Sequence, residues 1–138
     1  MARILVVEDD ENNFELLRWD LDDLHHECKL ATNAFDAVEL ARNEEFDLVL
    51  MDITIPPRDG EPHNSEPHGL AASMDIRRME PRMPIVAITA HGMAQIQQSV
   101  LDSGCNAILE KPFDFEQLED CLQEWLDHKS SDTTEQTQ

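Results

Sequence analysis

Short apolar runs alternate with amphipathic segments along this chain. Four strong runs lie at residues 3–7, 47–51, 84–88 and 106–110, and a weaker run lies at 27–31. Short apolar runs that are bounded by polar residues indicate buried strands. Nearly continuous apolar composition is typical of parallel strands that are covered on both faces. The pattern therefore predicts five strands of a parallel sheet.

Apolar residues recur at helical spacing in the segments that follow these runs. This repeat predicts helices at residues 11–25, 34–43, 69–79, 92–103 and 114–127. Asn33 precedes the second helix as an N-cap, and Gly104 follows the fourth as a C-cap. Short right-handed crossovers would join each strand to the next. We therefore predict an α/β fold, a doubly wound five-stranded parallel sheet with helices on both faces.

Length and charge exclude several classes of protein. The 138 residues fit one domain. The formal net charge of −20 disfavours direct binding to nucleic acid or to an anionic membrane, because both attract clustered lysine and arginine. No apolar run is long enough to cross a membrane or to form a signal peptide. The three cysteines follow no CxxC pattern. We expect a cytoplasmic protein with reduced thiols.

Two segments depart from this regular pattern. We expect one domain over residues 1–128 and a disordered polar tail over 129–138. A proline-rich loop at 57–68 carries His63 and His68 between glutamates. Two histidines with interleaved acids could ligate a transition metal. A solvated loop is the favoured interpretation, because the prolines resist closure around an ion.

A polar residue follows each of the four strong runs. Glu8 and Asp9 follow the first, and Asp52, Thr89 and Lys111 follow the other three. The carboxyl ends of parallel strands meet at one edge, where open α/β sheets bind ligands. Clustered carboxylates stay ionised around a cation, and oxygen ligands of high charge suit Mg²⁺. We expect a phosphoryl-transfer site in which Asp52 accepts the group, Thr89 donates a hydrogen bond and Lys111 neutralises charge.

Together these motifs resemble the receiver domains of two-component response regulators, over about residues 2–127. The matching segments are Val6-Val7-Glu8-Asp9, Met51-Asp52, Ile88-Thr89-Ala90 and Glu110-Lys111-Pro112-Phe113. The resemblance implies a flavodoxin-like sheet with the strand order 2-1-3-4-5. The chain is similar in particular to single-domain regulators of the chemotaxis type.

The resemblance also implies roles for the acidic residues. According to this resemblance, Asp52 is the phosphoacceptor and binds Mg²⁺ together with Asp9. Glu8 acts on the ion through water, and Thr54 contributes its backbone carbonyl as a ligand. Asp10 is the third acid in a row, and we expect it to begin the first helix, where its charge favours the helix dipole.

Three features need comparison with the family pattern. The glycines expected after the acceptor and at the start of the third helix match Gly60 and Gly69, which leaves an insertion of nine residues between them. Ile108 occupies the position where many receivers have a tyrosine or phenylalanine that reports on phosphorylation. The family also suggests a cis bond at Lys111–Pro112, which would aim the lysine into the site.

The function implied by the resemblance is signalling by phosphorylation. We expect a stand-alone regulator that takes a phosphoryl group onto Asp52 from a sensor histidine kinase or a phosphotransfer protein. It would then contact a downstream protein target through the fourth helix, fifth strand and fifth helix, or form a phosphorylation-dependent dimer. We do not expect an enzyme, because the chain would catalyse only its own phosphorylation and dephosphorylation.

Two other classes of function are considered. One is an interaction module that kept the fold and works without phosphorylation. Ile108 and the insertion slightly favour this class, and the complete set of site residues disfavours it. The other is a phosphatase with an aspartyl nucleophile. Such enzymes usually need a second aspartate two residues after the nucleophile, where this chain has Thr54.

Overall fold

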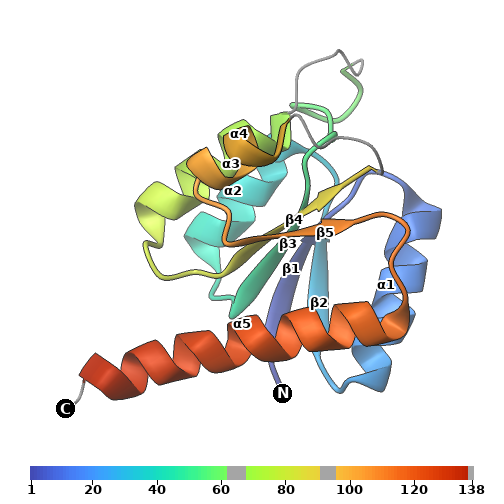
Figure 1. The fold of residues 1–138 in the computed structure, drawn as a ribbon. Helices are drawn as coiled ribbons and strands as arrows, with labels where there is room; N and C mark the ends of the chain where they lie inside the picture. The colour runs from blue at the N-terminus through green and yellow to red at the C-terminus, as the bar shows by residue number, and fades with distance from the viewer. Residues whose placement is uncertain (62–67, 91–95, 137–138) are drawn as a thin grey trace.

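A five-stranded parallel sheet forms the centre of the molecule (Figure 1). The computed structural model describes residues 1–61, 68–90 and 96–136. The strand order is β2-β1-β3-β4-β5. The strands are β1 Arg3–Val7, β2 Glu27–Ala31, β3 Leu48–Asp52, β4 Ile85–Thr89 and β5 Ala107–Glu110. The predicted strands and their predicted order are thus confirmed.

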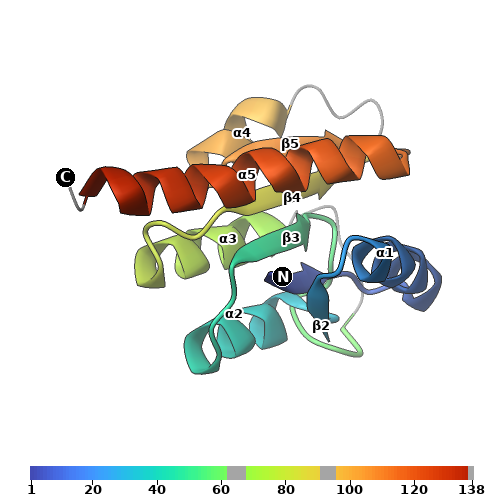
Figure 2. The ribbon, with the colours of Figure 1, turned by 90° about the horizontal axis from the view of Figure 1, so that it is seen from below.

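Helices cover both faces of the sheet (Figure 2). They are α1 Glu11–Asp23, α2 Ala34–Asn43, α3 His68–Met79, α4 Gln97–Asp102 and α5 Phe115–Gln136. One face packs against Leu17 and Leu21 of α1 and Leu118 and Leu122 of α5. The other packs against Ala37 of α2, Ile76 of α3 and Val100 of α4. All five residues of β3 and of β4 are buried, as expected for central strands with two covered faces.

The helix ends follow the polar signals in the sequence. Asp10 is the N-cap of α1, and its carboxylate accepts hydrogen bonds from two N–H groups of the first turn. The Asn33 side chain caps α2 in a similar way and accepts one hydrogen bond, from the Asp36 N–H at 2.8 Å. Gly104 follows the C-cap of α4 with φ +102°, a conformation that glycine adopts without strain.

The last helix differs from the prediction at its end. We predicted a disordered tail over 129–138, whereas α5 continues to Gln136. Neither proline nor glycine occurs from 114 to 136, so nothing in this stretch stops a helix that the core has already ordered. The domain boundary at residue 128 stays a prediction. The predicted start of the fourth helix, at residue 92, lies outside the described residues.

The strand register brings the predicted site residues to one edge. Val7 pairs with Met51 across β1 and β3, so the residues that follow them, Glu8 and Asp52, lie side by side. Asp52 in turn pairs with Ile88 of β4. None of the helices in the described part of the chain is long and apolar enough to span a membrane.

Candidate functional site

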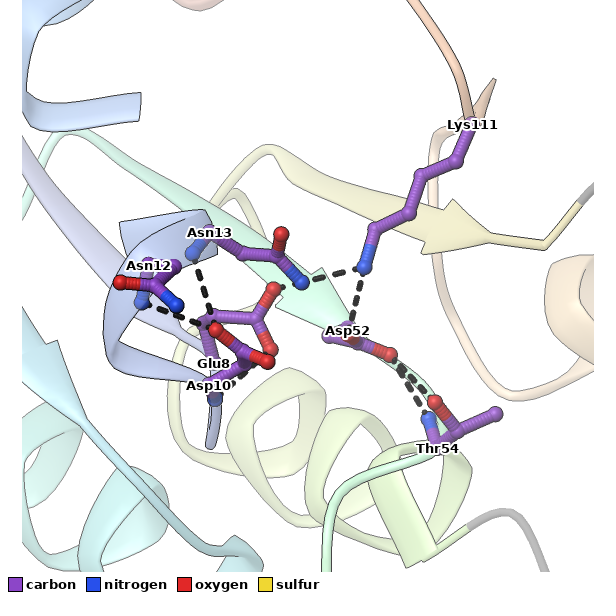
Figure 3. Close-up of polar contacts among 7 residues, drawn as sticks. All are labelled: Glu8, Asp10, Asn12, Asn13, Asp52, Thr54 and Lys111. Atoms are coloured by element: carbon purple, nitrogen blue, oxygen red, sulfur yellow. Dashed lines mark hydrogen bonds and ion pairs between the residues drawn. The ribbon is translucent and has the colours of Figure 1, made fainter. Parts of the chain in front are cut away.

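Asp52 lies at the centre of the carboxyl edge of the sheet, and both of its carboxylate oxygens accept hydrogen bonds (Figure 3). Oδ1 accepts from the Thr54 N–H at 2.9 Å and from the Thr54 hydroxyl at 2.8 Å. Oδ2 accepts from the Lys111 ammonium at 3.1 Å. The side chain of Asp52 is only 6% exposed, so the protein rather than bulk water fixes its orientation.

Lys111 joins two carboxylates that come from different strands. Its Nζ donates to Glu8 Oε1 at 3.3 Å as well as to Asp52 Oδ2. The Glu8 side chain is 4% exposed and the Lys111 side chain is 34% exposed, so Glu8 is buried and Lys111 is partly open to solvent. The Lys111–Pro112 peptide bond is cis, as the resemblance implied.

Asp9 completes an acidic cluster with Glu8 and Asp52. One carboxylate oxygen from each of the three lies within 4.8 Å of the others. Asp9 is exposed, whereas the other two are buried. Three carboxylates and one ammonium leave a formal charge of −2, which is what a divalent cation would balance. The donors are hard oxygens, the type that Mg²⁺ prefers.

The crowding of these charges shifts two pKa values. Burial, and then repulsion from Asp52, raises the pKa of Glu8 from 4.5 to about 7, although the Lys111 ammonium works in the opposite direction. Burial works to lower the pKa of Lys111, but attraction to Asp52 and Glu8 outweighs it and the pKa rises. Lys111 is therefore held as a cation, and a metal ion would favour the ionised form of Glu8.

Thr89 is the last residue of β4 and is buried beside the cluster. Its carbonyl accepts a hydrogen bond from the Lys111 N–H at 2.8 Å, which fixes the start of the segment that carries the lysine. The structure thus brings both predicted residues to the same edge. The contact of the Thr89 hydroxyl with a phosphoryl group stays a prediction.

The role of Thr54 goes beyond the predicted one. The resemblance implied that its backbone carbonyl is a metal ligand, and that role stays a prediction. The structure adds two hydrogen bonds, from the N–H and the hydroxyl of Thr54 to the Asp52 carboxylate. A short polar residue two places after an aspartate is the signal for such a local turn. That signal was present in the sequence at Asp52 and Thr54.

The third acid in the row has a different task, as expected. Asp10 Oδ1 accepts from the N–H groups of Asn12 and Asn13 at 2.8 and 3.1 Å and so caps α1 (Figure 3). The Asp10 N–H donates to Glu8 Oε2 at 3.3 Å. The same turn therefore starts the helix and orients Glu8.

The proline-rich loop lies only partly within the described residues. His63 and the rest of 62–67 lie outside them, so a metal site with His68 stays a hypothesis. His68 itself is the first residue of α3. Asp59 lies at the N-terminus of α2, where it accepts hydrogen bonds from the side chains of Thr32 and Asn33 at 2.6 and 2.8 Å.

The chain belongs to the response regulator receiver domain family, whose pattern matches residues 4–123. It is 34% identical over 123 residues to a sensor protein, GacS, of Pseudomonas syringae pv. syringae. It is 38% identical over 121 residues to hybrid signal transduction histidine kinase G of Dictyostelium discoideum. These matches cover 89% and 84% of this chain but only 13% and 3% of the two relatives.

Solved structures show the same fold. The receiver domain of a sensor histidine kinase from Pseudomonas aeruginosa PAO1, with a magnesium ion coordinated in its active site cleft, is 31% identical with a TM-score of 0.77. That match covers 91% of this chain and 97% of the other. A CheY-like receiver domain from Methanospirillum hungatei JF-1 is 25% identical with a TM-score of 0.83, covering 96% and 98%. This chain is thus homologous to the phosphoacceptor domains of two-component signalling.

Proposed function

We propose that this chain accepts a phosphoryl group from a phosphohistidine onto Asp52 and signals through phosphorylation-dependent contacts with other proteins. The observation that carries the proposal is the placement of the Asp52 carboxylate. It is buried, it is held by Thr54 on one oxygen and by Lys111 on the other, and it lies within an acidic cluster. The proposal keeps the cytoplasmic location expected from the sequence.

The transfer needs little beyond positioning and charge neutralisation. A carboxylate oxygen of Asp52 attacks phosphorus, and the P–N bond of the phosphohistidine breaks. The imidazole nitrogen leaves with the electron pair and takes up a proton. Lys111 remains charged beside the incoming oxygens, and Thr89 would offer its hydroxyl to one of them. The product is an acyl phosphate on Asp52.

Mg²⁺ is the cofactor that the donor set fits. Asp9 and Asp52 would hold it through their carboxylates and Glu8 through a water molecule, with the Thr54 backbone carbonyl as a further ligand. When bound, the ion would neutralise charge on the phosphoryl oxygens. The relative from Pseudomonas aeruginosa, whose structure holds magnesium in the corresponding cleft, supports this assignment.

Receiver domains interact with histidine kinases or phosphotransfer proteins, and the relatives from Dictyostelium discoideum and Pseudomonas aeruginosa are a histidine kinase and the receiver domain of one. We propose a sensor histidine kinase or a phosphotransfer protein as the donor. A downstream protein would recognise the face formed by α4, β5 and α5. Ile108, at the usual aromatic position, packs against the core on the side of α2, α3 and α4, so the signal would reach this face without an aromatic switch. A stand-alone role and a phosphorylation-dependent dimer stay predictions.

Intact mass tests the proposal. The protein is incubated with a small acyl phosphate and Mg²⁺, with Asp52→Asn and a Mg²⁺-free sample as controls. We expect a gain of one phosphoryl group in the original protein alone. Labelling that survives in Asp52→Asn would contradict the assignment of the acceptor. No labelling, with no effect of Mg²⁺ on melting, would favour the phosphorylation-independent module.

A further inference from the structure

Gly69 lies against the backbone of the acceptor itself. It is the second residue of α3 and is buried. A Cβ atom at this position would lie 2.5 Å from the Ile53 Cα and 2.7 Å from the Asp52 carbonyl oxygen. Both of these are backbone atoms, so they cannot rotate away as the end of a flexible side chain can. Only a hydrogen atom fits between the first turn of α3 and the end of β3.

Hydrogen bonds hold this contact on both sides. The Gly69 N–H donates to the Ile53 carbonyl at 3.1 Å, and the Ile53 N–H donates to the Ile88 carbonyl of β4 at 3.3 Å. The buried Ser73 hydroxyl donates to the Gly69 carbonyl at 2.9 Å. The residue after Asp52 is therefore fixed between β4 and α3, and Gly69 sets how closely α3 approaches.

The hydrogen bond between Gly69 and Ile53 makes the position of Asp52 independent of the loop that follows it. The chain leaves β3 at Ile53 and returns to the same point at Gly69. The length of the segment between them therefore does not set the position of Asp52. The N-terminal end of the proline-rich loop is held separately, because the carbonyls of Pro56 and Pro57 accept hydrogen bonds from the first N–H groups of α2.

We infer that Gly69 is a positioning residue for phosphoryl transfer, an inference that rests on the function proposed for Asp52. Displacing the backbone of Asp52 by a few tenths of an ångström would move its carboxylate relative to Lys111, which comes from β5 and would not follow. A misplacement of about 1 Å can cost about 100-fold in rate. Gly69 acts through the acceptor and does not touch the phosphoryl group.

The test compares Gly69→Ala with Gly104→Ala by rate and by NMR. A Cβ at Gly104 would lie 2.9 Å from the Arg77 Cγ, and its φ of +102° also penalises alanine. The control therefore carries a folding penalty without touching β3. Phosphorylation by a small acyl phosphate is measured at saturating Mg²⁺ and well below the melting temperature. The Thr54 amide resonance is recorded in parallel, since this N–H is bonded to Asp52 Oδ1.

We expect Gly69→Ala to lower the maximal rate about tenfold or more and to shift the Thr54 amide, while Gly104→Ala changes neither. A maximal rate within twofold of the original protein, with an unshifted Thr54 amide, would overturn the inference. If Gly69→Ala does not fold, the rate of Ser73→Ala tests the inference instead. This variant removes the hydrogen bond to the Gly69 carbonyl and so loosens the first turn of α3 without adding an atom. We expect it to lower the rate two- to fivefold, and no change would overturn the inference.

Failure of the proposed function is distinguishable from failure of this inference. If the original protein takes up no phosphoryl group, the function of Asp52 is contradicted. The Thr54 amide and Mg²⁺ affinity then still report whether Gly69 positions the Asp52 carboxylate. A shift of both in Gly69→Ala alone supports the positioning role, and unchanged values reject it.

Discussion

Glu8 and Asp52 share a single ammonium group. Lys111 Nζ lies 3.3 Å from Glu8 Oε1 and 3.1 Å from Asp52 Oδ2, and both carboxylates are buried. Glu8 and Asp52 repel each other, so the lysine is the group that keeps them together when no metal is bound. In the proposed phosphoryl transfer to Asp52, the same ammonium would already lie beside the oxygen atoms that gain charge.

Lys111→Met should lower the rate of phosphorylation by about 100-fold or more, because loss of one charged donor at a developing negative charge has effects of that size. The side chain of methionine keeps much of the length of lysine but not its charge. The rate is followed by intact mass with a small acyl phosphate. Lys29→Met is the matched control, since Lys29 pairs with Glu44 on the surface, away from the cluster. Equal rates for the two variants would be inconsistent with the role of Lys111.

Variants at Asp9 and Asp10 should distinguish the contribution of metal binding to stability from that of helix capping. Mg²⁺ at about 100 times its Kd should stabilise the original protein by about 2.7 kcal/mol. Asp9→Asn should lose most of this gain. Asp10→Ala should lower the free energy of unfolding by about 1 kcal/mol, because it removes the N-cap of α1, but it should keep the gain from Mg²⁺. Denaturant unfolding with and without Mg²⁺ measures both. Loss of the Mg²⁺ effect in Asp10→Ala would refute this division.

Glu8→Gln should stabilise the metal-free protein at pH 8. The folded pKa is about 7, above the ordinary 4.5, so the folded state holds more protons than the unfolded state between these values. Stability therefore falls as pH rises from about 4.5 to 7, by about 1.4 kcal/mol per pKa unit and about 3 kcal/mol in total. Glutamine removes this penalty. Unfolding in urea at pH 5 and pH 8, with a chelator, measures the difference.

Glu44→Gln is a control in which the carboxylate is expected to stabilise the folded state rather than to destabilise it. Hydrogen bonds from Lys29 and Arg3 lower the pKa of Glu44, so this carboxylate favours the folded state at neutral pH and its replacement should not stabilise. A Glu8→Gln variant that is less stable than the original protein at pH 8 would show that the Glu8 carboxylate is not penalised in the fold.

Removal of residues 129–138 should leave the core intact. The described residues of α5 that pack on the sheet are Leu118, Cys121, Leu122, Trp125 and Leu126. All of them precede residue 128, where we place the domain boundary. We therefore expect a melting temperature within about 2 °C of the full chain, by differential scanning calorimetry, and unchanged phosphorylation. A large loss of stability would place the boundary further along α5.

The sheet and the placement of the site residues at its edge could be predicted because two signals marked each of the four strong strands. An apolar run of strand length marked the buried segment, and a polar residue after it marked the edge. At β3 both signals were clear, since Leu48–Asp52 is buried throughout and ends on the proposed acceptor, Asp52. The weaker run at β2, an edge strand, alternates between exposed and partly buried positions before the buried Ala31, and composition alone marked it less strongly.

Other features depend on three-dimensional approach and left no local pattern. The bond between Lys111 and Glu8 joins residues 103 positions apart, and no spacing rule in the sequence predicts it. The contact of Gly69 with the backbone of Ile53 could be recognised only from the distances. The end of α5 was missed for another reason. Polar composition indicated disorder, whereas a helix that is already formed can continue through polar residues.

The separation between Lys111 and Glu8 has a consequence for quality control in signalling. The acceptor, its ammonium and its acidic neighbours come from the first, third and fifth strands, so they meet only after the whole sheet has assembled. A nascent chain released before residue 111 has the aspartate but lacks the lysine beside it. If Asp52 is phosphorylated as proposed, a truncated or misfolded copy would lack the ammonium beside the aspartate and would take up phosphate far more slowly than a finished molecule.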